Sequence, residues 1–95
     1  MSMEELVSNY ISSVEHVLEE IKTVDKPLNV DLESVKKVIE CARAYLDDAK
    51  YYKEKMRLEV SLAAVAYCEG LLDALKLLGA VEFEWPARRK SGRER

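Results

Sequence analysis

The chain has 95 residues, enough for one domain but too few for two independent hydrophobic cores. Apolar residues make up 48% of it and charged residues 35%, with only two prolines and three glycines. This composition excludes a wholly disordered chain and favours a helix-rich globular protein. No apolar run approaches the roughly 18 to 20 residues needed to cross a bilayer, so no membrane association is expected.

The net charge of −3 is unevenly distributed. Residues 88–95 contain five basic residues against one acidic residue, whereas residues 1–87 contain ten Lys and Arg against 17 Asp and Glu. An acidic body does not attract nucleic acid by itself. Phosphate binding would therefore depend on Arg88, Arg89 and Lys90. Residues 87–95 are predicted to form a basic, disordered tail.

The first predicted helix covers residues 3–25. Its apolar residues recur at alternating steps of four and three, which places them on one helical face. They are Met3, Val7, Tyr10, Val14, Val17, Ile21 and Val24. Ser2 and Glu5 have the spacing of a capping box at its start, and Pro27 prevents the helix from continuing.

The second predicted helix covers residues 32–55, with Asp31 as its N-cap. Its apolar residues also follow a seven-residue repeat. They are Val35, Val38, Ala42, Tyr45, Ala49, Tyr52 and Met56. Two matching repeats predict that the first two helices pack nearly antiparallel, with a shallow left-handed crossing.

The third predicted helix covers residues 58–78. An unbroken helix from residue 32 to residue 79 is the alternative, but it would be about 70 Å long, so we expect a turn near Met56 and Arg57. The third segment is apolar over more than one face, which predicts an interface with a second copy or another protein. Leu71 and Leu78 are its candidate partner-binding residues.

A short extended arm is predicted after Gly79, a typical helix C-cap residue. Val81, Phe83 and Trp85 alternate with glutamates, which gives the arm one apolar face. We favour an arrangement in which Phe83 and Trp85 fold back over the end of the bundle. The alternative is that these two aromatic residues bind a partner.

Catalytic and ligand-binding motifs are not expected. His16 is the single histidine, and neither HExxH nor GxSxG occurs. Cys41 and Cys68 lack CxxC spacing and a secretory leader, which predicts free thiols and a cytoplasmic location. Asp48 and Asp73 are expected to accept hydrogen bonds from tyrosines. The sequence therefore predicts no catalytic residue, metal site or cofactor, and a protein that is not an enzyme.

The stretch from Ala42 to Trp85 resembles the archaeal family catalogued as domain of unknown function 357. The resemblance rests on Tyr45, Asp48-Ala49, Tyr51-Tyr52, Tyr67, Gly70-Leu71-Leu72-Asp73-Ala74 and Gly79. It implies a three-helix up-and-down bundle, an archaeal source and no established activity, with some relatives joined to a nucleotidyltransferase-like domain. The family commonly has Gly-Asp in the second turn, where this chain has Met56-Arg57.

These observations predict an all-α protein: a three-helix up-and-down antiparallel bundle over residues 1–86 with a short C-terminal extended arm. The predicted function is a non-enzymatic protein-interaction or assembly module, whose partner is a second copy or another helical protein. The alternative is a nucleic-acid or nucleotidyltransferase-associated accessory protein that acts through Arg88, Arg89 and Lys90.

Overall fold

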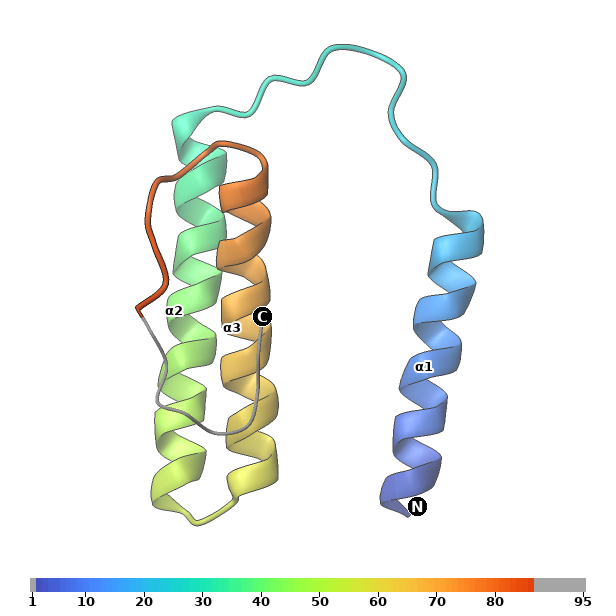
Figure 1. The fold of residues 1–95 in the computed structure, drawn as a ribbon, viewed down its shortest axis with the longest axis vertical. Helices are drawn as coiled ribbons and strands as arrows, with labels where there is room; N and C mark the ends of the chain where they lie inside the picture. The colour runs from blue at the N-terminus through green and yellow to red at the C-terminus, as the bar shows by residue number, and fades with distance from the viewer. Residues whose placement is uncertain (1, 87–95) are drawn as a thin grey trace.

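The computed structural model describes residues 2–86 and confirms an all-α protein with three helices. They are α1 (Met3–Glu20), α2 (Leu32–Glu54) and α3 (Leu58–Leu77), and no strand occurs among the described residues (Figure 1). The predicted tail at residues 87–95 lies outside this range. The helix bounds match the predicted ones closely, except that α1 ends five residues earlier than expected.

Both predicted N-caps of α1 and α2 are present. The Glu5 backbone N–H donates to the Ser2 hydroxyl at 3.0 Å, and the Ser2 backbone N–H donates back to the Glu5 carboxylate at 3.0 Å. At α2 the Ser34 N–H donates to the Asp31 carboxylate at 2.8 Å. These bonds hold the pKa values of Glu5 and Asp31 below their ordinary values, because they favour the ionised carboxylates.

The early end of α1 follows from its last turn. That turn contains Glu19 and Glu20 and no basic residue, so its charge opposes the negative end of the helix dipole. Ile21 is already extended, with φ −65° and ψ 138°. Residues 21–31 then form a connection without regular secondary structure, which includes Pro27.

Helices α2 and α3 form an antiparallel hairpin with a narrow core. The five buried residues are Val35, Ala42, Ala49, Cys68 and Leu75. They are spaced by seven on each helix, as in a shallow left-handed crossing. Ser61 continues the series on α3, and its hydroxyl donates to the Ala49 carbonyl at 2.7 Å.

The hairpin core therefore has three levels. Ala49 lies opposite Ser61 near the turn, Ala42 lies level with Cys68 in the middle, and Val35 lies level with Leu75 at the open end. Small side chains at the first two levels let the two helices approach closely. Ala42 is only 2% exposed, so the middle level leaves no room for a larger side chain.

The break predicted near Met56 and Arg57 is confirmed, and it has the geometry of a Schellman motif. The Arg57 N–H donates to the Tyr52 carbonyl at 2.8 Å, and the Met56 N–H donates to the Lys53 carbonyl at 3.0 Å. Met56 has φ +61°, the left-handed conformation that usually requires glycine. The same motif ends α3, where Gly79 has φ +75°.

The predicted packing of the first helix against the second is not found. Within the described residues α1 contacts neither α2 nor α3, and none of its residues is buried. The radius of gyration is 16.2 Å, against about 12 Å for a compact chain of this length. The seven-residue repeat predicted an apolar face on α1 correctly, but a repeat does not specify which surface covers that face. The helices keep an up-and-down order, with α1 apart from the hairpin (Figure 1).

Candidate protein-interaction surfaces

The hairpin has two broad sides, which are identified by two side-chain contacts. On one side the rings of Tyr45 and Tyr67 stack with centroids 4.4 Å apart and an interplanar angle of 19°. On the other side Asp73 accepts a hydrogen bond from Trp85. Since successive residues of a helix are rotated by about 100°, Tyr67 and Asp73 lie on opposite sides of the α3 core row. We call these sides the tyrosine face and the arm face.

The tyrosine face is a continuous apolar surface across both helices. By helical position it comprises Val38, Tyr45 and Tyr52 from α2 with Val60, Ala64, Tyr67, Leu71 and Leu78 from α3 and its C-cap. Tyr67 is 54% exposed and Leu78 71% exposed, whereas Leu71 is half-buried. The neighbouring Tyr67 hydroxyl and partial burial raise the pKa of Tyr45 above its ordinary value. No other helix of the described chain contacts this face, and residues 28–32 approach it at the Leu78 end.

An apolar pocket extends the tyrosine face at the open end of the hairpin. Its volume is about 480 Å³, and it opens to solvent. It lies between the end of the 21–31 connection and the end of α3, and is lined by Leu28, Val30, Leu32, Val35, Leu78, Gly79 and Ala80. Leu78 therefore joins the pocket to the tyrosine face.

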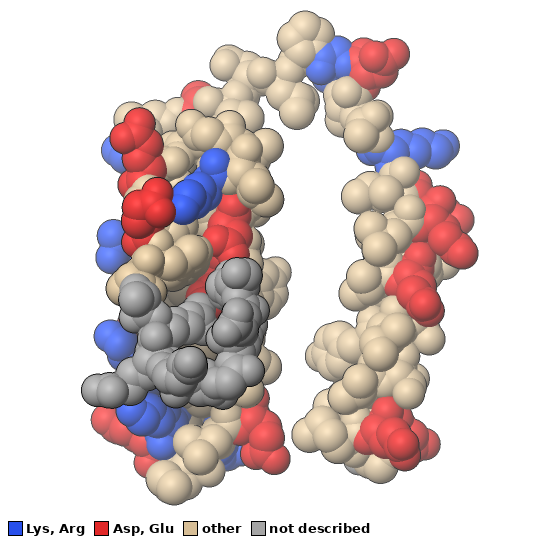
Figure 2. Space-filling model, in the orientation of Figure 1, with Lys and Arg blue, Asp and Glu red and all other residues tan. Residues whose placement is uncertain are grey.

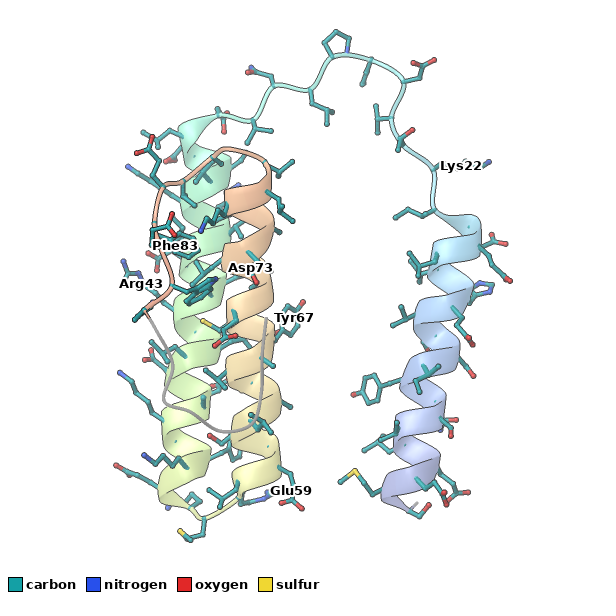
Figure 3. The ribbon with its side chains drawn as sticks, viewed as in Figure 1. Lys22, Arg43, Glu59, Tyr67, Asp73 and Phe83 are labelled. Carbon is teal, nitrogen blue, oxygen red and sulfur yellow. The ribbon has the colours of Figure 1, made fainter. Side chains whose placement is uncertain are left out.

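The arm face is covered by the chain's own arm, residues 80–86, which runs back along the hairpin (Figure 1). The Trp85 indole N–H donates to the Asp73 carboxylate at 2.8 Å, and the Phe83 and Trp85 rings meet edge to face at 4.9 Å. The Lys76 ammonium lies 4.9 Å from the Phe83 ring centroid and 3.7 Å from the Glu84 carboxylate. Figure 3 shows Phe83 and Asp73 on the same side of the hairpin.

This geometry confirms that Phe83 and Trp85 fold back onto the chain. It also corrects the expectation for Asp73, whose partner is the Trp85 indole and not a tyrosine. The physical reason is the reversal after Gly79, which returns the arm along α3 at the height of Asp73. The four candidate partner-binding residues therefore do not form one site. Phe83 and Trp85 lie on the arm face, Leu71 and Leu78 belong to the tyrosine face, and Arg88, Arg89 and Lys90 lie outside the described residues.

Helix α1 carries the third apolar surface. Eight of its large apolar side chains are exposed: Met3, Leu6, Val7, Tyr10, Ile11, Val14, Val17 and Leu18. Leu6, Ile11 and Leu18 were not part of the predicted stripe, although their spacing from Val7 and Val14 places them beside it. All five charged residues of α1 are glutamates, and they lie mainly on the side away from the hairpin (Figure 2). We call the eight apolar residues the α1 face.

No arrangement for catalysis is found among the described residues. His16 and Cys41 are exposed, and no three His, Cys, Asp or Glu side chains of residues 2–86 cluster in a way that could hold a metal ion. Cys68 is buried in the hairpin core, and this burial raises the pKa of its thiol.

The family described as "Protein of unknown function (DUF357)" matches residues 9–81. The chain belongs to this family. The DUF357 match includes most of α1, the whole hairpin and the start of the arm, so α1 and the hairpin are parts of one family unit although they do not touch. No curated protein and no solved structure matches the chain. None of the described DUF357 helices has the length and hydrophobicity to cross a membrane.

Proposed function

We propose that this DUF357 protein is a non-enzymatic protein-interaction or assembly module that binds amphipathic helices. One observation carries the proposal: the α1 face and the tyrosine face are both apolar, both uncovered and not in contact with each other. Contiguous exposed apolar surface of this kind is typical of binding sites for other proteins.

The energetics of the two parts support this proposal. Most of the stability of a protein helix comes from packing of its apolar face, and α1 makes no contact with α2 or α3 that would supply it. The hairpin buries only five residues, and two of these are alanines. A domain normally needs packed layers around a common core, so both parts gain stability when a further helix covers them.

The arm is not required for this binding. Phe83 and Trp85 are engaged with Lys76 and Asp73, so their aromatic surface is already partly used within the chain. The tyrosine face is on the other side of α3 and is available without moving the arm. Binding should therefore involve Leu71, Leu78 and Tyr67 and not the two arm aromatics.

Affinity capture with surface variants tests the proposed function. Leu71→Glu places a charge on the tyrosine face, whereas Leu77→Glu makes the same chemical change at a leucine that is 88% exposed and lies on the outer side of α3. We expect proteins retained by the wild-type chain from an extract of its source cells to be retained by Leu77→Glu and lost with Leu71→Glu. Equal retention by both variants, with helix content unchanged in circular dichroism, would contradict the proposal.

The basic tail provides the alternative function, an accessory role beside nucleic acid or a nucleotide enzyme. Its support is the concentration of Arg88, Arg89 and Lys90 directly after the anchored arm. Deletion of residues 87–95 separates the two functions, because it should leave helix binding intact and abolish salt-sensitive binding to nucleic acid. We further propose a cytoplasmic location, which is supported by the two free thiols of Cys41 and Cys68.

A further inference from the structure

We infer that the tyrosine face of one chain is covered by α1 of a second copy, in a symmetric dimer whose two chains exchange their α1 helices. This inference rests on the proposed function and names its partner. Each chain would supply one α1 face and one tyrosine face, so the same contact forms twice and the assembly closes. The arm face and its contacts remain unchanged in such a dimer.

The two surfaces match in length and composition. Helix α1 has 18 residues and is therefore about 27 Å long, the same length as the stretch of α3 from Val60 to Leu78. Each surface has eight apolar side chains. A chain in the dimer thus contributes 16 apolar residues to the interface, which with a polar rim approaches the roughly 20 residues per partner of a standard stable interface.

Charge disfavours the simplest alternative, in which two α1 helices pair with each other. Helix α1 has five glutamates and neither Lys nor Arg, so such a pair would bring together two helices of the same charge with no basic residue to balance them. Residues 32–77 contain eight acidic and eight basic residues and are neutral overall. The acidic α1 is therefore electrostatically better matched to the neutral hairpin than to another α1.

The connection between α1 and α2 is long enough for α1 to reach the hairpin of a second copy. Residues 21–31 have no regular secondary structure, and α1 makes no contact with its own hairpin. Eleven residues in extended conformation span up to about 36–40 Å, which is enough to place α1 on a neighbouring molecule. An amphipathic helix extended from its own domain on such a connection is the element that domain swapping exchanges.

Complementation between two variants tests the exchange. Val14 lies in the middle of the α1 face and is 55% exposed, and Leu71 lies in the middle of the tyrosine face. At a concentration where the full-length wild-type chain sediments as a dimer, Val14→Glu alone and Leu71→Glu alone should both sediment as monomers. An equimolar mixture should form a heterodimer, because an intact α1 from one variant meets an intact tyrosine face from the other.

The controls separate the possible arrangements. If α1 helices paired with each other, the Leu71→Glu variant alone would remain dimeric. If α1 folded onto its own hairpin, the wild-type chain would be a monomer and the mixture of variants would show no dimer. Either result overturns the exchange. Leu78→Glu repeats the test at a residue that is 71% exposed, where substitution leaves the five-residue hairpin core intact.

The outcomes also separate this inference from the proposed function. A monomeric wild-type chain that still captures proteins in a Leu71-dependent manner would overturn the exchange and leave the interaction module standing. A monomeric wild-type chain without such capture would overturn both. Isotope-filtered nuclear Overhauser effects give an independent readout, since contacts from α1 methyl groups of a labelled copy to the Tyr67 ring of an unlabelled copy occur only if the helices are exchanged.

Discussion

Replacing Met56 by glycine should stabilise the hairpin. Met56 has φ +61° and is 75% exposed, so its side chain contributes little packing while its backbone is in the left-handed region. That conformation costs an L-residue about 1–2 kcal/mol. Glycine avoids this cost but loses about 0.5–1 kcal/mol more conformational entropy on folding. The net gain expected for Met56→Gly is therefore about 0.5–1 kcal/mol.

Gly79 offers the matched reverse substitution, because it occupies the same position of the same motif at the end of α3. A Cβ atom at Gly79 would meet no atom within 4 Å, so Gly79→Ala tests the backbone conformation without a steric clash. It should destabilise the protein by about the amount that Met56→Gly stabilises it. Met56→Ala keeps a Cβ atom and should be nearly neutral.

Urea and thermal unfolding followed by circular dichroism measure these changes. A stabilisation of about 0.5–1 kcal/mol corresponds to an increase of about 2–8 °C in Tm for a domain of this size. The denaturant m-value should stay constant, since the surface exposed on unfolding does not change. If Met56→Gly lowers Tm while Met56→Ala leaves it unchanged, residue 56 is not left-handed in solution and the reasoning is refuted.

Three further predictions concern the arm, the cysteines and the α2 cap. Asp73→Ala should increase acrylamide quenching of Trp85, the only tryptophan of the sequence, because it removes the acceptor of the indole hydrogen bond. Asp73→Asn should increase the quenching less, because it keeps an oxygen acceptor. Equal quenching in the wild-type chain and both variants would refute the Asp73–Trp85 hydrogen bond. Cys41 is exposed, whereas burial of Cys68 raises the pKa of its thiol, so Cys41 should react with a maleimide more than about tenfold faster than Cys68. Peptide mapping of the labelled protein measures the two rates, and equal rates would show that the hairpin core is open to solvent. The folded-state pKa of Asp31 is lowered, so its stabilising effect is full above the unfolded pKa and is lost as the pH falls through the folded pKa. The stability difference between the wild-type chain and Asp31→Ala should accordingly narrow in acid, and a pH-independent difference would argue against the cap.

Local chemistry made most of the fold predictable. The Ser2–Glu5 box, the Asp31 cap and the Gly79 cap each depend on residues only a few positions apart, and all three are found in the structure. The seven-residue repeat on α2 includes the three buried residues of that helix, Val35, Ala42 and Ala49, whereas Met56 of the same repeat is 75% exposed. The turn at Met56 contained no turn-forming residue and was inferred only from the length that an unbroken helix would have.

Long-range partners could not be derived from the same patterns. The repeat on α1 shows that one face is apolar, but the covering surface depends on the path of residues 21–31, which no periodicity encodes. Asp73 had several tyrosines as possible partners, and its bond to Trp85 depends on where the arm returns after Gly79. The candidate partner-binding residues lie on the predicted elements, Leu71 and Leu78 at α3 and Phe83 and Trp85 on the arm, and their role in binding stays a prediction.

The separation of α1 from the hairpin has a consequence for biosynthesis. Glu20 leaves the ribosome 58 residues before Leu78 completes the tyrosine face, which at 5–20 residues per second is a delay of about 3–12 s. The hairpin itself can fold as soon as α3 has been made, since α2 and α3 are neighbours in sequence. Its low contact order favours folding in microseconds to milliseconds. When several ribosomes translate one messenger RNA, the α1 helix of a later chain can thus meet the folded hairpin of an earlier chain before the hairpin of the later chain has been made.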